Sequence, residues 1–357
     1  MWASWINLFF ANILISILNA WVLYYVLNRI FTIFNLNIHK RILLIIAVIL
    51  WFLIISTIMY QWNSKFIDIV WTFSSWIFVL SFLFAIVLVL EQIIGKRYKI
   101  NPRIILWVVV IILWIWIYFS LKTKIISYNI TTDKIEKDAK ILLVSDFHAD
   151  NIYKDFHIKK LEKLIELEKP DFVLIAWDMM NKANPEYPKY FSIWKNINIP
   201  VFAVMWNHDM LWDHEIINEI PKVSWITLLN NETVELNWIQ IIWLTDRSIR
   251  WWTKLDENLE KCNIKSNSDF SILITHQPIS LEKLKNYQID LEVAGHTHHG
   301  QIFWLRRLTE IVNDYWYWKF EENWKTAIVT QWIWTRWLPF RLWTQSEMVI
   351  INLKKNS

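Results

Sequence analysis

Four long runs without a charged side chain constrain this chain more than any other feature. They cover residues 1–28, 42–59, 69–90 and 104–121. Each is about long enough to cross the roughly 30 Å hydrocarbon core of a bilayer as a helix. One such run is typical of a buried core helix, but four runs joined by short polar links favour a membrane region. The sequence therefore predicts a transmembrane anchor of four helices over residues 1–121.

The distribution of Lys and Arg predicts the orientation of this anchor. The first and third links hold seven basic residues, namely Arg29, Lys40, Arg41, Lys96, Arg97, Lys99 and Arg103. The second link and the residues just after the fourth run hold three, namely Lys65, Lys122 and Lys124. Basic residues concentrate in cytoplasmic links. We therefore expect a multi-pass membrane protein whose residues after 121 lie on the outer face of the cytoplasmic membrane.

From about residue 122 the chain reads as an α/β domain. Apolar runs predict strands at 139–146, 171–176, 200–205, 271–275, 291–295, 326–330 and 347–353. Helical spacing predicts a helix over 157–170 that stops at Pro170. We assign 139–357 to this domain and 122–138 to a linker or edge strand. The net charge of +4, without a basic stripe interleaved with aromatics, argues against a nucleic-acid partner, and the single cysteine excludes a cysteine-rich zinc site.

Polar residues follow five of the predicted strands. They are Asp146 and His148, Asp178, Asn207-His208-Asp209, His276, and finally His296 and His298. Each group alone is typical of a surface turn, a helix cap or a structural histidine, so the inference depends on the whole set. Strand ends in α/β folds lead into one crevice, where these side chains would meet. Carboxylate, imidazole and amide ligands suit Mn, Fe or Zn ions.

The motifs "SDFH", "WD", "WNHD", "THQP" and "GHTHHGQ" occur in this order. Together they resemble the calcineurin-like metallophosphoesterase family, with its pattern D-x-H, G-D, G-N-H-D/E, H and G-H-x-H, and most closely its bacterial membrane-anchored subgroup. The resemblance covers about residues 139–353. It implies two packed β-sheets flanked by helices, following the four-helix transmembrane region. The sequence departs from the pattern at Trp177, Trp206 and His299.

The resemblance implies a site with two divalent metal ions, of which Mn, Fe and Zn are the best candidates. Each ion would have three ligands of its own, and one carboxylate would bridge both. The first set is Asp146, His148 and His298, the second is Asn207, His276 and His296, and the bridge is Asp178. A hydroxide shared by the ions would attack phosphorus in line. His208 is the candidate to protonate the leaving oxygen, and Asp209 either orients His208 or caps the next helix.

The implied activity is hydrolysis of a phosphomonoester or phosphodiester at the membrane surface. A site beside a bilayer favours a lipid-linked phosphate as substrate. The alternative is a non-catalytic, membrane-anchored binding or scaffold module on the same fold, although decayed enzymes usually lose a ligand and all seven are present here. A transporter is disfavoured because the uncharged runs contain no relay of ionisable groups. Nothing in the sequence specifies an oligomeric state.

The count of tryptophan is abnormal. The chain has 27 Trp and 3 Gly, whereas average glycine usage of about 7% would give roughly 25. Trp177 and Trp206 stand where the family has Gly, and Asn323-Trp324 would be a hairpin signal if its second residue were Gly. Aromatic belts at membrane interfaces explain some of these residues but not the many after residue 121. We hypothesise that most are glycine in the native protein, encoded by UGA codons.

Overall fold

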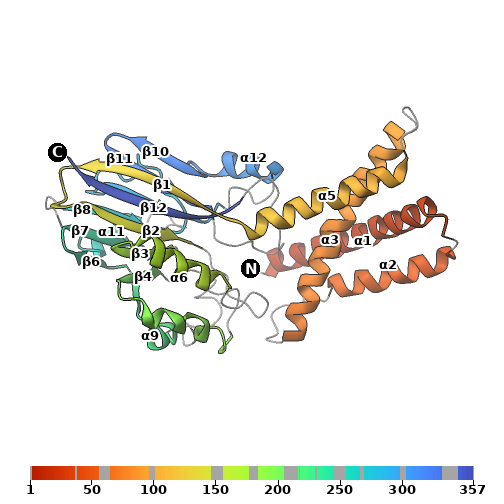
Figure 1. The fold of residues 1–357 in the computed structure, drawn as a ribbon, viewed down its shortest axis with the longest axis horizontal. Coiled ribbons are helices and arrows are strands. Elements are labelled where there is room, and N and C mark those ends of the chain that lie inside the picture. Colours follow the sequence, from red (N-terminus) through yellow and green to blue (C-terminus); the bar gives the residue numbers. More distant parts are fainter. Residues whose placement is uncertain are drawn as a thin grey trace. The chain divides into compact units, whose positions relative to one another are not determined.

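The computed structural model describes most of the chain, which divides into two compact units (Figure 1). One unit extends to Tyr118 and the other begins at Phe119. The described residues are 2–36, 38–55, 65–95, 101–145, 156–176, 184–204, 216, 218–229, 231–244, 255–265, 269–297, 303–331 and 345–356. Each unit is described by itself.

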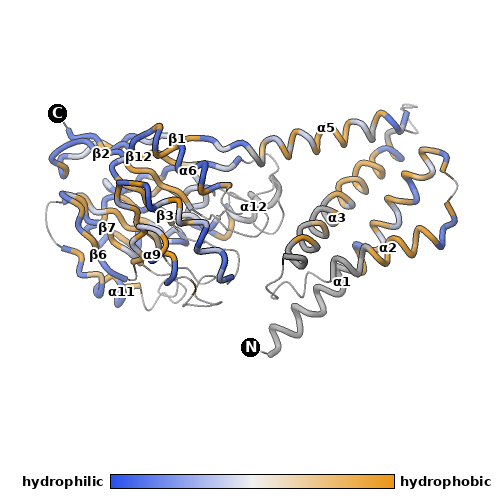
Figure 2. Tube along the Cα trace, turned by 60° about the horizontal axis from the view of Figure 1, so that its bottom comes forward, coloured by the Kyte–Doolittle hydropathy of each residue, from blue (hydrophilic) through white to orange (hydrophobic). Residues whose placement is uncertain are grey.

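The first unit is helical. It contains α1 (Trp2–Ile33), α2 (Lys40–Ile55), α3 (Lys65–Leu90), the short π-helix η2 (Glu91–Gly95) and α5 (Pro102–Leu121). The described parts of these helices are mostly hydrophobic (Figure 2). No helix in the described part of the chain has both the length and the apolarity of a membrane span. The predicted four-helix transmembrane region is therefore not confirmed.

The second unit is built on two six-stranded sheets, in the orders β1-β12-β2-β3-β4-β5 and β10-β11-β9-β8-β7-β6. The first sheet contains β1 (Thr123–Thr132), β2 (Ala139–Val144), β3 (Phe172–Ile175), β4 (Val201–Val204), β5 (Ile226–Leu229) and β12 (Ser346–Lys355). The second contains β6 (Thr233–Leu236), β7 (Ile239–Trp243), β8 (Phe270–Ile274), β9 (Leu291–Ala294), β10 (Trp318–Glu322) and β11 (Lys325–Val329). Two packed mixed sheets flanked by helices confirm the predicted fold of this domain.

The central strands are apolar because both of their faces are covered. In β2, Ile141 and Leu143 belong to the core between the sheets, whereas Leu142 and Val144 pack under α6 (Phe156–Glu168). The outer face of the second sheet packs in the same way against α11 (Leu255–Lys261). The remaining helices are η3 (Pro188–Asn196), α9 (Ile220–Val223) and α12 (Phe303–Val312). The core between the sheets thus holds the two halves of the domain together.

Local chemistry explains where one helix ends. Helix α6 ends at Glu168, because Lys169 takes a left-handed φ of 48° and Pro170 cannot continue a helix.

Residues 123–132 form β1, an edge strand that runs parallel to β12 along its whole length. This pairing joins the start of the domain to its last strand.

The β10–β11 hairpin has backbone geometry that glycine favours. Glu322 pairs with Lys325, so the loop consists of Asn323 and Trp324, with φ of 46° and 64°. Two consecutive positive φ values define a type I′ turn, for which Asn-Gly is the preferred sequence. Trp318, at the start of β10, has φ of 88°. The backbone at residue 324 therefore favours glycine, which is the residue that the glycine hypothesis predicts there.

We predict that Trp324→Gly is more stable than Trp324→Ala by about 1 kcal/mol, because both lose the indole but only alanine keeps the Cβ that disfavours a left-handed backbone. In the wild type, the Lys325 ammonium nitrogen lies 4.0 Å from the centre of the Trp324 ring. Both variants lose this contact, so its loss cancels when they are compared with each other. Urea unfolding of the full chain measures the difference in the free energy of unfolding.

Trp225 is the matched control, since it is as exposed as Trp324, at 65%, and does not have a positive φ. There the order should reverse, with Ala more stable than Gly. The same order at both positions would contradict the argument from backbone geometry. Independently, mass spectrometry of the native protein should find glycine in peptides that cover residue 324.

Candidate metal centre

Two predicted ligands leave the second sheet side by side. Strands β8 and β9 are parallel neighbours, with Ile274 paired to Val293. His276 follows the end of β8 by two residues, and His296 follows the end of β9 by two. Because parallel strands end at the same edge of a sheet, both imidazoles are placed at this edge.

The two imidazoles are in direct contact. His296 Nδ1 lies 2.8 Å from His276 Nε2, and the ring centres are 4.6 Å apart at an interplanar angle of 72°. One of the two nitrogens must carry the proton of this hydrogen bond, and the tautomer follows from that assignment. His276 is buried. The pair therefore points two ring nitrogens at one small volume.

Backbone hydrogen bonds fix the loops that carry the pair. The Gly295 amide donates to the His276 carbonyl at 3.1 Å, and the Thr275 amide donates to the Val293 carbonyl at the same distance. The Thr297 hydroxyl donates to the carbonyl of Trp316. His296 itself has φ of 67°, a sparsely populated conformation that persists only when its surroundings hold it in place.

The pair fits a divalent metal ion. Two nitrogens bound to neighbouring positions of one ion at about 2.1 Å would lie about 3 Å apart, close to the 2.8 Å between His276 Nε2 and His296 Nδ1. An ion would replace the proton shared by the rings, so its affinity would fall at acidic pH. Imidazole nitrogen suits Mn, Fe and Zn better than Ca.

The other predicted site residues lie outside the described part of the chain. They are Asp146, His148, Asp178, Asn207, His208, Asp209 and His298. Strands β2, β3 and β4, which precede the first six of these, are mutually parallel neighbours in the first sheet. Within the described residues, no group of three His, Cys, Asp or Glu side chains could hold a metal ion. The structure thus brings His276 and His296 together, and the other roles stay predictions.

Comparison with known proteins finds a similarity that covers this region. Residues 139–300 match the family described as calcineurin-like phosphoesterase. This part of the chain is thus similar to that family, and it contains both His276 and His296. The match supports a hydrolase that acts on phosphoesters.

Two curated bacterial relatives extend beyond this segment. An uncharacterized metallophosphoesterase of Campylobacter jejuni is 27% identical over 271 residues, which cover 72% of each chain. An uncharacterized metallophosphoesterase of Helicobacter pylori is 27% identical over 237 residues, covering 65% of this chain and 64% of its own. An archaeal phosphodiesterase of known structure aligns with a TM-score of 0.32 and 16% identity, covering 54% of this chain and 84% of its own.

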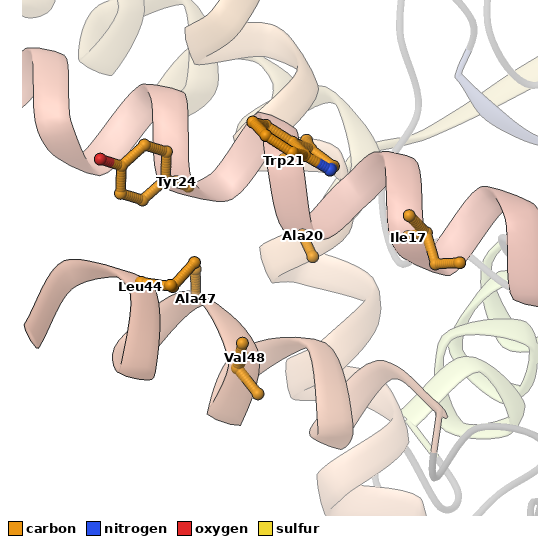
Figure 3. A pocket seen from close by; sticks show the side chains of 7 residues that line it. All are labelled: Ile17, Ala20, Trp21, Tyr24, Leu44, Ala47 and Val48. Carbon is orange, nitrogen blue, oxygen red and sulfur yellow. The ribbon is translucent and has the colours of Figure 1, made fainter. Parts of the chain in front are cut away.

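A separate hollow of about 540 Å³ lies in the helical unit, between α1 and α2 (Figure 3). Its lining is Ile17, Ala20, Trp21, Tyr24, Leu44, Ala47 and Val48. Apart from the Tyr24 hydroxyl and the Trp21 indole nitrogen, these side chains are apolar. The hollow therefore lacks the acids, bases and metal ligands that phosphoester hydrolysis requires.

Sequence reasoning missed a buried carboxylate that holds the loop carrying His276. Glu292 lies in β9 with no exposed surface, and its Oε1 accepts hydrogen bonds from the Thr275 hydroxyl at 3.0 Å and the Ile279 amide at 2.6 Å. It thereby holds both sides of the loop that carries His276. Burial raises the pKa of Glu292, and the two hydrogen bonds lower it. Burial is the larger effect, so the pKa is about 8. The available signal was an acidic residue inside the apolar run "LEVAG".

We predict that Glu292→Gln makes stability less dependent on pH. Because folding raises the pKa of Glu292 from 4.5 to about 8, its contribution is fully present below about pH 4.5 and declines as the pH rises to about 8. Glutamine keeps the accepting oxygen and cannot ionise, so the decline in this window should become shallower. Urea unfolding at several pH values across the window measures the slope.

Glu292→Ala separates titration from the hydrogen bonds. Compared with Glu292→Gln, this variant leaves the Ile279 amide without its acceptor and should be less stable by about 1–3 kcal/mol at every pH. If Glu292→Gln keeps the wild-type slope, then Glu292 is already ionised in the folded protein and the raised pKa is wrong.

Proposed function

We propose that this chain is a membrane-anchored phosphoesterase that uses two divalent ions, Mn, Fe or Zn, to hydrolyse a phosphomonoester or phosphodiester. The observation that carries the proposal is the contact between His276 and His296 at the ends of adjacent strands, within the segment that matches the family. We further propose that the substrate is a lipid-linked phosphate at the outer face of the cytoplasmic membrane.

The proposed roles follow the order of motifs along the chain. Asp146, His148 and His298 would hold one ion, and Asn207, His276 and His296 the other, with Asp178 shared between them. Bound ions would supply Lewis-acid activation of a phosphoryl oxygen and of water. His208 would donate a proton to the leaving oxygen of the substrate. Asp209 would accept a hydrogen bond from His208 and so hold its ring in place.

The polarity of the helical unit supports the proposed anchor. Asn19 and Ser81 are buried between α1 and α3, where the Ser81 hydroxyl donates to Asn19 Oδ1 at 2.8 Å. In contrast, Ile104 and Ile111 on α5 are 58% and 56% exposed. Polar groups inside and large apolar groups outside would be unfavourable in water, where exposed apolar patches are normally small. The same arrangement is favourable against hydrocarbon, in which polar side chains pair between helices.

An ion pair fits the proposed anchor. Arg29, near the end of α1, lies 2.7 Å from the carboxylate of Glu91, directly after α3, and Glu91 is buried. Both residues border the links that are richest in Lys and Arg, which are the proposed cytoplasmic links. The pair thus lies at one end of the apolar helices, away from the proposed hydrocarbon centre.

We predict that Asp178→Asn abolishes hydrolysis and releases metal, because both ions share this ligand. His208→Ala should keep the metal and lower turnover by roughly 100- to 10,000-fold, the usual contribution of a general acid. The measurement is an assay of the purified full chain with added Mn on a panel of phosphomonoesters and phosphodiesters, together with its metal content.

His39→Ala is the control for the histidine substitution, since His39 is exposed in the helical unit, and it should leave turnover unchanged. Full activity of Asp178→Asn would end the two-ion proposal. Metal uptake by the wild-type protein without hydrolysis of any ester on the panel would favour the binding or scaffold module instead.

We also predict that protease added to intact cells, or to spheroplasts if an outer membrane is present, digests the chain after residue 121 and leaves the helical unit. Long domains are translocated largely regardless of their charge, so the basic links decide the orientation. Immunoblots against both ends of the chain measure the result. Protection of the phosphoesterase domain until the membrane is lysed would reverse the proposed orientation.

A further inference from the structure

A second buried carboxylate joins the two sheets. Glu347 lies in β12 and is 1% exposed. Val349, two residues further along the strand and therefore on the same face, belongs to the core between the sheets. Glu347 accepts four hydrogen bonds from the second sheet. The donors are the Thr330 hydroxyl at 2.9 Å, the Gln331 amide at 2.9 Å, Gln331 Nε2 at 3.0 Å and the Tyr317 hydroxyl at 3.1 Å.

These donors lie at the ends of two strands. Thr330 and Gln331 directly follow β11, and Tyr317 directly precedes β10. One carboxylate therefore connects β12 of the first sheet with β10 and β11 of the second. Since few hydrogen bonds cross between packed sheets, this connection restricts the spacing of the sheets at one end of the domain.

That end is the one from which the predicted ligands emerge. Strand β12 is antiparallel to β2, with Val349 opposite Leu143, and continuing this register puts Glu347 level with Ser145, the residue before Asp146. On the second sheet, the Thr330 amide donates to the Ala294 carbonyl at 2.8 Å, two residues before His296. Glu347 thus links the strand end before Asp146 to the strand end before His296.

We propose that Glu347 is a positioning residue that sets the distance between the ligands of the first sheet and those of the second. The proposal rests on the proposed function, because a two-ion centre needs ligands from both sheets at a fixed separation. Residues outside the ligand set that orient ligands typically change metal affinity or activity by 10- to 100-fold when they are replaced.

Asp290 provides a matched control. It is also a buried carboxylate, at 7% exposure, and accepts hydrogen bonds from the Lys134 ammonium at 2.6 Å and the Ser271 amide at 2.9 Å. Asp290 directly precedes β9, and its partner Ser271 is the second residue of β8. Asp290 therefore lies at the opposite end of the second sheet from His276 and His296. Its replacement disturbs the fold without disturbing the proposed link between ligands.

The experiment compares the full wild-type chain with Glu347→Ala, Glu347→Gln and Asp290→Asn. Calorimetric titration with Mn²⁺ gives affinity and stoichiometry, and electron paramagnetic resonance reports whether two bound Mn²⁺ ions are close enough to couple magnetically. We expect Glu347→Ala to weaken Mn²⁺ binding by about 10- to 100-fold and to lose the coupled signal. Glu347→Gln keeps one acceptor for Thr330 and the Gln331 amide, so it should lie between wild type and Glu347→Ala. If Glu347→Ala does not fold, Glu347→Gln still tests the proposal by the same two metal measurements.

Asp290→Asn should lower the melting temperature yet keep both Mn²⁺ affinity and the coupled signal. If the Glu347 variants lose stability but match Asp290→Asn in both metal measurements, Glu347 is only structural and the positioning proposal fails, while hydrolysis by the wild type leaves the proposed function standing. If the wild type takes up no Mn²⁺ and hydrolyses no ester, the proposed function fails and the positioning role fails with it.

Discussion

Burial of the central strands on both faces is the constraint on which the domain depends. Strand β3 is buried at all four positions, and β8 at all five. A strand with apolar layers above and below has little room for a ligand or a catalytic acid along its length. Chemistry is therefore confined to the residues that follow the strands, where the backbone leaves the layers. His276 and His296 occupy such positions, and their contact follows from the parallel register of β8 and β9.

Two buried carboxylates in the strands, Glu292 and Glu347, differ in the balance between desolvation and hydrogen bonding. Glu292 receives two hydrogen bonds, and desolvation raises its pKa to about 8. Glu347 receives four, which lower its pKa, yet burial still raises it overall. In each case the carboxylate fixes backbone just outside a strand end, at Ile279 and at Gln331. Buried carboxylates are unfavourable unless they are satisfied, so their positions beside loops that carry or border the candidate site suggest selection for geometry rather than for stability.

The sequence was sufficient for the strands that carry predicted ligands, because short apolar runs ending in polar residues have few other interpretations. It was also sufficient for the juxtaposition of His276 and His296. The pairing of β1 with β12 joins residues that are more than 200 positions apart, and local patterns do not encode such a partner. The roles of Glu292 and Glu347 depend on donors from other elements. The sequence could mark them as acidic residues in apolar runs, but it could not identify those donors.

Backbone geometry tests the glycine hypothesis at individual tryptophan positions, whereas composition gives only their total number. At Trp324 the turn itself requires a positive φ, whereas in the β6–β7 hairpin Asn237 takes the positive φ of 57° and Trp238 does not. The tryptophans are therefore not equivalent, and the argument from torsion applies to particular residues. At Trp177 and Trp206 the reason for glycine would be space, since each adjoins a predicted ligand. A Cβ and an indole there would narrow the volume that the ions and the phosphoryl group must share, so the activity we propose is that of the chain with glycine at both positions.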